Sequence, residues 1–449
     1  MDTLRHGLGR TGLGIPYMVW GLVLVALLLR LVALCVFHGP DLVSASESGL
    51  TAANWVAGQG YTFDLYGYRT EHPCQSFMPP LFTIIVAGCL LTPWPEVSMG
   101  LVQALLSSLT VLLVFLIAKS LADSTVGITA AALSAAYPPF LVLVDQPTVP
   151  VLNTFLLGLF FWFSIQLLRS LDRKWAVLAG LTLGLCVLSR PTFAGFFGIL
   201  LITLWLARAR RGGRWWRAIV LVAAAMALII SPWLIRNWWV QGRPVGVSTN
   251  GGFTFWNGNN PFTTGFGFDV VIDDLQAYSG EIVEAAEGTE ILEVKPYPLP
   301  LELRDSVGSL GEVELDRAFY QAAFGFISQD PGRWAETTVQ KAVGLWWFRP
   351  NIGVSSGFYQ EAWILPYKIL YSFVLLFAVV GLVLSFRNWR RYVLLYGVIP
   401  YLTVAYVAFN VITRYRWEMK PYLLIFAALA LVRAGRRVAV RRAWPSWSL

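Results

Sequence analysis

Apolar runs long enough to cross a lipid bilayer recur along most of this chain. A helix needs about 20 apolar residues to span the hydrocarbon layer. About ten such windows occur, at 17–37, 97–118, 125–143, 150–168, 175–188, 191–207, 217–236, 364–386, 391–411 and 419–434. Of the 449 residues, 56% are hydrophobic and only 13% are charged, far from the average of soluble domains. We therefore expect an all-α polytopic membrane protein with about ten transmembrane helices.

The windows divide the chain into three parts. We expect a transmembrane core over 1–236, which includes a first loop outside the cytoplasm at 38–96. Residues 237–363 are largely polar, and their hairpin and helix signals predict a mixed α/β extracytoplasmic domain. Residues 364–449 hold the last transmembrane helices and a basic cytoplasmic tail.

The distribution of charge predicts the orientation. One side of the bilayer, which includes both termini, carries 19 Lys and Arg residues against three acids, whereas the other carries 14 against 23. Cytoplasmic loops of membrane proteins have such an excess of cations. We therefore place both termini in the cytoplasm and 237–363 outside it. The pI of about 9.3 then reflects topology, and we expect no nucleic-acid partner.

Several cations nevertheless stand at outer helix ends, against the general bias. The clearest are those of the segment "RYRWEMKP" together with one preceding arginine: Arg349, Arg414, Arg416 and Lys420. Guanidinium groups present paired N–H donors that match phosphate oxygens. The cluster predicts a site for an anionic lipid headgroup. The alternative is that these side chains reach the membrane surface and pair with outer acids.

The segment "STNGGFTFWNGNNPFTTGFG" (248–267) has two Asn-Gly pairs that flank alternating aromatic residues. This pattern is typical of a β-hairpin. An aromatic ring next to amide side chains is also suited to stacking on a sugar and bonding its hydroxyls, which makes Trp256, Asn257 and Asn259 candidate sugar contacts. A rigid lid over the membrane surface is the alternative interpretation.

Five segments of the chain together resemble the bacterial GT-C membrane glycosyltransferases, the relatives of protein O-mannosyltransferases and of the lipid A aminoarabinose transferase. They are the segment at 248–267, "LSRPT" (188–192), "SPWLIRNW" (231–238), "ELDRAFYQAAFGFISQDPGRW" (314–334) and "RYRWEMKPYLLIFAALAL" (414–431). The resemblance implies a helical membrane core, a sugar donor linked to polyprenyl phosphate, and inverting transfer without a nucleotide sugar. It also implies a bacterial plasma (inner) membrane location.

The first loop departs from the family where its catalytic acid is expected. Members begin the first outer helix with Asp and carry Tyr four residues later, but those places hold Ser44 and Ser48 here. Glu47 falls where some members have an additional acid, so the resemblance makes it the candidate general base, with Asp41 second. A general base takes the proton of the acceptor hydroxyl as its oxygen attacks the sugar.

A second family acid commonly follows a "YPP" motif after the third helix. Its place holds Pro150, and Asp145 lies five residues earlier, as a further candidate contact to the acceptor or sugar. Arg349, Arg414, Arg416 and Lys420 would hold the donor phosphate. A divalent cation is compatible with the reaction, although no set of metal ligands stands out in the sequence.

The sequence thus predicts transfer of a sugar from a polyprenyl-phosphate-linked donor to an acceptor hydroxyl on the outer face of the membrane. Membrane lipids and an unidentified acceptor would be its partners. The alternative is a catalytically inactive GT-C-like scaffold, or an accessory subunit with partner proteins in a membrane complex, because both usual acids are displaced. A transporter is disfavoured, since the sequence has no internal repeat.

Overall fold

A computed structural model describes residues 15–36, 46–65, 73–142, 144, 148–207, 214–280, 282, 290–293, 297–347 and 361–443. Three of the candidate site residues, Asp41, Asp145 and Arg349, lie outside these ranges. The remaining candidates are all within the described part of the chain.

Every predicted apolar window coincides with helical structure. The bundle consists of α1 (Tyr17–Val36), α4 (Pro95–Leu121), α5 (Ser124–Ala136), α6 (Pro138–Val142), α7 (Val149–Ser170), α8 (Arg173–Ser189), the 3-10 turn η2 (Pro191–Ala194), α9 (Gly195–Ala207), α10 (Arg214–Gln241), α15 (Glu361–Ser385), η6 (Phe386–Asn388), α16 (Trp389–Ala408) and α17 (Lys420–Ala443). Within the described ranges, five helical stretches have the length and apolarity of a membrane span, and one of them contains both α15 and α16. The chain is a polytopic helical membrane protein.

Helix α1 illustrates why the bundle needs a lipid environment. Its small residues Ala26 and Ala33 are buried against the neighbouring helices, whereas Leu24, Leu28 and Val32 remain 53–59% exposed. A helix with apolar residues on every side is stable only where its outer face meets lipid. Close contact between helices is provided by residues such as Gly381, at which an added Cβ would lie 1.9 Å from the Phe426 carbonyl oxygen.

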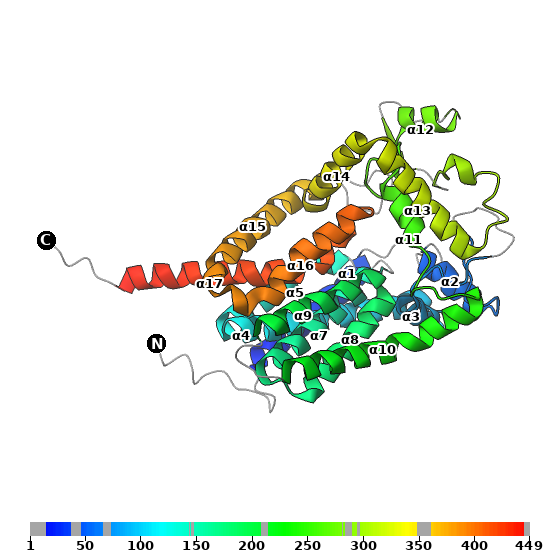
Figure 1. Ribbon diagram of the computed structural model, residues 1–449. Helices are drawn as coiled ribbons and strands as arrows, with labels where there is room; N and C mark the ends of the chain where they lie inside the picture. The colour runs from blue at the N-terminus through cyan, green and yellow to red at the C-terminus, as the bar shows by residue number, and fades with distance from the viewer. Residues whose placement is uncertain are drawn as a thin grey trace.

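A separate polar domain, defined here as the described residues of 242–347, stands at one end of the bundle (Figure 1). It contains α11 (Gly251–Gly258), β1 (Asp269–Val271), α12 (Ile272–Ser279), β2 (Ile291–Glu293), η4 (Leu301–Leu303), α13 (Glu312–Gln329) and α14 (Pro331–Trp346). Strands β1 and β2 pair antiparallel, with Asp269 opposite Glu293. The predicted combination of a helical membrane core and a mixed α/β domain is confirmed.

The predicted hairpin within 248–267 is wrong, because Gly251–Gly258 forms helix α11. A helical turn places Phe253 and Trp256 on one face, and both are almost fully buried in the domain core. The second Asn-Gly pair serves close packing instead of a tight turn. At Gly258 an added Cβ would lie 1.8 Å from the carbonyl oxygen of Phe409, so only glycine fits between α11 and the end of α16.

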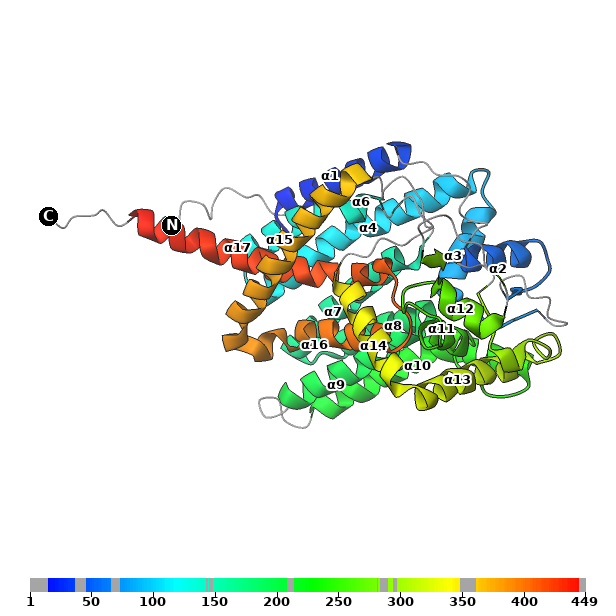
Figure 2. The same cartoon turned by 90° about the horizontal axis from the view of Figure 1, so that it is seen from above.

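The first loop, defined as the described residues of 46–79, packs against the polar domain beside α3 (Pro80–Leu90). Phe63 and Phe77 belong to the same apolar core as Phe253 of α11. Glu312 at the start of α13 accepts hydrogen bonds from the backbone N–H groups of Gln75 (2.7 Å) and Ser76 (2.9 Å). The loop and the domain thus form one body outside the bundle, as the two views indicate (Figures 1 and 2).

A second carboxylate of α13 lies deeper in this body. Asp316 Oδ1 accepts a hydrogen bond of 2.6 Å from the backbone N–H of Gly252, at the start of α11. Burial raises the pKa of Asp316 to about 6, and the negative charge of Glu312 acts in the same direction. The side chain therefore fastens α11 to α13 in a site that disfavours its ionised form.

Candidate functional site

A buried carboxylate organises the turn between the last two helices. This turn is the 3-10 segment η7 (Thr413–Glu418), and Glu418 at its end is fully buried. Its Oε1 accepts a hydrogen bond of 2.7 Å from Asn153 Nδ2 of α7 and lies 3.5 Å from Arg190 at the end of α8. Its Oε2 accepts from the hydroxyl of Tyr406 in α16. Four helices therefore converge on one carboxylate.

Aromatic rings complete this network. The Arg190 guanidinium lies 4.7 Å from the ring centroid of Tyr415 and 5.5 Å from that of Tyr406. The two rings stack on each other with centroids 4.7 Å apart. Cation–π contacts of this kind stabilise a charge that has lost its water. Glu418 is thus neutralised and fully hydrogen-bonded, which makes it a fixed anchor for η7 and ill-suited to take a substrate proton.

Two cations next to this anchor are buried among tyrosines. Arg416 is 2% exposed and Lys420 is 1% exposed. Lys420 Nζ donates to the hydroxyl of Tyr367 at 2.7 Å and lies 4.9 Å from the ring centroid of Tyr137. The Arg416 guanidinium lies 5.0 Å from the ring of Tyr371. We call these five residues the aromatic cage.

The charge balance of the cage is positive. Arg416 Nη1 donates to the backbone carbonyl of Trp347 at 3.1 Å, and within the described ranges no carboxylate forms an ion pair with Lys420. Burying an ammonium without a counter-ion costs free energy, so the binding of an anion there would be strongly favourable. Arg414, at the start of the same turn, is partly buried. The predicted phosphate-binding residues Arg414, Arg416 and Lys420 thus lie on consecutive turns of one segment.

The predicted base Glu47 is the first residue of α2 (Glu47–Val56). Ser46 caps this helix, because its hydroxyl accepts a hydrogen bond of 3.0 Å from the N–H of Gly49. Glu47 is partly buried, while its neighbour Ser48 faces inward at 4% exposure.

The end of α2 explains the "GQGY" string of the first loop. Gly58 and Gly60 adopt positive φ angles of 80° and 84°, which other residues rarely tolerate. This path turns the chain so that the Tyr61 hydroxyl donates to the carbonyl of Met78 at 2.9 Å. Burial raises the pKa of Tyr61 well above its ordinary value. Tyr61 therefore ties the end of α2 to the start of α3.

Comparison with known proteins supports a specific fold. Residues 72–236 match the family of dolichyl-phosphate-mannose-protein mannosyltransferases. No curated protein matches the chain at a significant level. The Archaeoglobus fulgidus oligosaccharyltransferase, tethered with an acceptor peptide, has a similar structure, with a TM-score of 0.55 and 14% identity over 96% of this chain and 51% of that chain.

A second structure of that enzyme, AglB in complex with an inhibitory peptide and a dolichol-phosphate, gives a TM-score of 0.53 and 15% identity over 95% of this chain and 51% of that one. The chain therefore has a fold similar to that of this membrane oligosaccharyltransferase. It spans about half the length of AglB. ArnT from Cupriavidus metallidurans, bound to undecaprenyl phosphate, matches at a TM-score of 0.44 and 16% identity over 94% of this chain and 78% of that chain.

Three other predicted contact residues lie in the interior of the polar domain. Trp256, Asn257 and Asn259 are each at most 3% exposed, and their contact with a sugar stays a prediction. Trp256 Nε1 donates to the Pro298 carbonyl, and Asn259 Nδ2 donates to the carbonyl of Ala408. These contacts make the segment a packing element between the polar domain and the end of α16.

Lys341 of α14 completes this interior network. Its ammonium donates to the carbonyls of Gly258 (3.0 Å) and Phe409 (3.1 Å) and to Oδ1 of Asn259 (3.1 Å). All three N–H donors of the ammonium are satisfied. Burial nevertheless lowers the pKa of Lys341 to about 8. Lys341 therefore joins α14, α11 and the end of α16.

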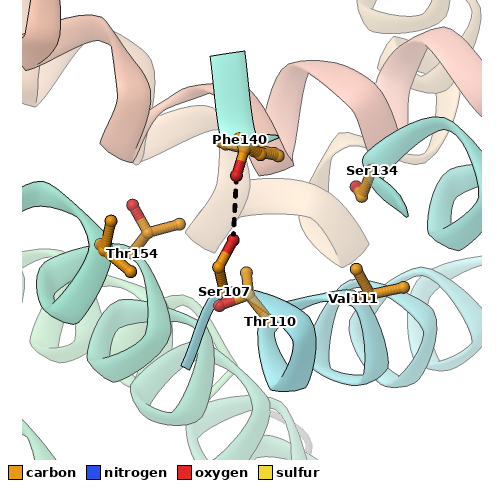
Figure 3. Close-up of a pocket in the computed structure, with 7 residues that line it drawn as sticks. Ser107, Thr110, Val111, Ser134, Phe140 and Thr154 are labelled. Atoms are coloured by element: carbon orange, nitrogen blue, oxygen red, sulfur yellow. Dashed lines mark hydrogen bonds between the residues drawn. The ribbon is translucent and has the colours of Figure 1, made fainter. Parts of the chain in front are cut away.

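The helix bundle also has a small cavity between α4, α5, α6 and α7. It is lined by Ser107, Thr110, Val111, Ser134, Phe140, Val151 and Thr154 (Figure 3). Its volume is about 10 Å³, which is room for about one water molecule. Arg30 donates through Nε to Ser107 at 2.7 Å. Ser107 in turn donates to the Phe140 carbonyl at 3.4 Å (Figure 3). Arg30 thus makes structural contacts inside the bundle, and the cavity is too small for a sugar.

Sequence reasoning overlooked three members of the site, Asn153, Tyr406 and Glu418. A signal for Glu418 was present, because it stands between Arg416 and Lys420 in "RYRWEMKP". An acid that alternates with cations in a short apolar-flanked segment needs its own partners. Among the described residues, no group of three His, Cys, Asp or Glu side chains has the arrangement of a metal site.

Proposed function

We propose that this chain transfers a sugar from a polyprenyl-phosphate-linked donor to an acceptor hydroxyl on the outer face of a bacterial plasma membrane. The observation that carries the proposal is the aromatic cage, in which Arg416 and Lys420 are buried beside the membrane core. The AglB structure of the same fold contains a dolichol-phosphate, which is the same class of ligand. In this orientation both termini are cytoplasmic and the polar domain is extracytoplasmic.

The cage would hold the lipid phosphate through charge-assisted hydrogen bonds. Arg416 offers a planar set of donors and Lys420 adds a point charge. Arg414 adds a further cation on the same segment, and Arg349 is a candidate from the sequence alone. The tyrosines exclude water from the cations, which strengthens their attraction for the phosphate. The charge that develops on the leaving phosphate oxygen during transfer would be stabilised by the same groups.

Glu47 would act as the general base, with Asp41 as the second candidate. Its carboxylate takes the proton of the acceptor hydroxyl, the acceptor oxygen forms a bond to the anomeric carbon, and the bond between that carbon and the phosphate oxygen breaks. The configuration at the sugar inverts, and the polyprenyl phosphate leaves with both bonding electrons. The candidate contacts to the sugar or acceptor are Asp145, Trp256, Asn257 and Asn259. The last three are buried, which supports an indirect role for them.

One observation favours a second function, that of an inactive scaffold in a membrane complex. The family's two conserved first-loop places hold Ser44 and Ser48, so activity depends on a displaced acid. Glu47→Gln distinguishes the two. It keeps the size of the side chain but cannot accept a proton, so transfer should fall by roughly 10²–10⁴-fold while polyprenyl phosphate still binds.

The assay uses purified full-length protein in nanodiscs with a polyprenyl-phosphate-linked sugar, and Asp41→Asn is the parallel variant. Glu96→Gln is the matched control, because Glu96 lies at the start of α4 outside the first helix of the loop. Normal transfer by both Glu47→Gln and Asp41→Asn would exclude either acid as the base. Lipid-phosphate binding without transfer in the wild type, across the donors tried, would favour the scaffold.

A further inference from the structure

A second cavity lies at the end of the bundle opposite the polar domain. It has a volume of about 390 Å³, within the range of small-molecule sites. It is formed where α4, α7 and α9 end and α16 begins, as the ends of these helices in Figure 1 indicate. We call it the basic pocket, because Arg169, Arg390 and Arg391 line it.

Two of the three guanidinium groups converge on one acceptor. Arg169 and Arg391 both donate to the backbone carbonyl of Ser120 near the end of α4, the latter at 3.1 Å. This carbonyl holds two like charges close together. Each guanidinium has five N–H donors, so most of their hydrogen-bonding capacity is left for another acceptor.

The basic pocket has no acid of its own in the described part of the chain. None of its three arginines forms an ion pair there. Asp123, an acid on the same side of the membrane, forms an ion pair with Arg436 at 2.9 Å. A pocket with three cations and no counter-ion is suited to an anion with several oxygen atoms.

The remaining wall of the basic pocket is apolar. Leu121, Leu168 and Leu206 line it next to the arginines. A free phosphate ion would gain nothing from these side chains, whereas the glycerol backbone and first methylene groups of a lipid would bury apolar area against them. Basic pockets between transmembrane helices on the cytoplasmic side suit anionic lipid headgroups.

We propose that the basic pocket binds the phosphate of an anionic phospholipid of the cytoplasmic leaflet. The arginines bind the headgroup, and the leucines contact the start of the acyl chains. The site is separate from the aromatic cage, which lies at the other end of α16 and α7. Its occupancy does not depend on the proposed transferase activity.

The test compares two charge-matched triple variants of the full chain in detergent. The pocket variant carries Arg169→Gln, Arg390→Gln and Arg391→Gln. The control carries Arg173→Gln, Arg387→Gln and Arg437→Gln, which are exposed residues of the same side that do not line the pocket. Binding of short-chain phosphatidylglycerol is measured by native mass spectrometry. We expect the pocket variant to bind roughly a hundredfold more weakly than wild type, and the control to bind almost normally.

Three results would overturn the proposal. Equal losses in both triple variants would mean that only general surface charge attracts the lipid. Equal binding of phosphatidylcholine, which has a phosphate but no net charge, would remove the selection for an anion. Displacement of the lipid by inorganic phosphate at similar concentration would identify free phosphate as the ligand. Arg390→Gln alone keeps the test valid if the triple variant unfolds, because Arg390 makes no hydrogen bond within the described ranges.

Discussion

The guanidinium of Arg190 lies 3.5 Å from the carboxylate of Glu418, which joins the end of α8 to the turn before α17. Because Glu418 is fully buried, removing Arg190 alone leaves an uncompensated charge that costs roughly 3–5 kcal/mol. We expect Arg190→Met to lower the thermal midpoint in detergent strongly. Combining it with Glu418→Leu should restore part of the loss. Strictly additive losses in this double-mutant cycle would contradict a direct interaction.

Lys420→Met separates a binding role from a structural one. The change keeps the length of the side chain and removes a buried charge that costs stability, so the ligand-free protein should be at least as stable as wild type. Binding of polyprenyl phosphate, measured by microscale thermophoresis, should weaken roughly tenfold to hundredfold. Lys174→Met, at the start of α8, serves as the control. A less stable protein that binds the lipid normally would show that Lys420 only supports the fold.

Asp316 predicts a pH dependence of the polar domain. Its folded-state pKa of about 6 lies above the value of ~3.9 for an exposed carboxyl. Between these values the folded chain holds the proton more tightly than the unfolded chain, so stability falls as the pH rises from about 4 to about 6. The loss amounts to at most about 3 kcal/mol.

Hydrogen exchange at the amides of α11 measures this effect at pH 4.5 and pH 7, after correction for the intrinsic exchange rate. Asp316→Asn should remove most of the difference, whereas Asp273→Asn, on the exposed side of α12, should not. An unchanged pH dependence in Asp316→Asn would assign the effect to another group.

The orientation of the chain is testable with cysteine labelling. Ser279→Cys and Ser309→Cys, introduced singly into a Cys35→Ser background, should react with a membrane-impermeant maleimide in intact spheroplasts. The background change removes the exposed native thiol. Reaction at these positions only after lysis would place the polar domain in the cytoplasm and reverse the predicted topology.

The bundle was predictable because each helix has to present about 20 apolar residues to lipid, a signal that a single sequence carries. The excess of cations on one side is an equally direct signal, and the orientation is predicted from it. Helix α11 was mispredicted because alternation of aromatic residues over four positions fits a strand and a buried helical turn alike. Its packing partners, Phe319 of α13 and Phe77 of the first loop, come from distant parts of the sequence.

The sequence singled out the cations but not Glu418, and the binding of phosphate by these cations stays a prediction. Arg416 and Lys420 stood out because they contradict the positive-inside bias. Glu418 required knowledge of which helices surround η7, since Asn153 and Tyr406 are 265 and 12 residues away. The tyrosines that surround Lys420 also come from α15 and from the segment before α6, and no local pattern brings them together.

The hydrogen bonds of Lys341 and of the loop after α16 connect the polar domain to the segment that carries the cations. Asn410 exchanges two hydrogen bonds of 3.0 Å with the backbone of Gly267, directly beside the Lys341 contact to Phe409. Asn410 is only six residues before Arg416. The polar domain is therefore attached to the chain at the end of α16, directly before the segment that carries the cations. Under the proposed function, a displacement of the polar domain when an acceptor binds would pull directly on the segment that carries Arg416 and Lys420.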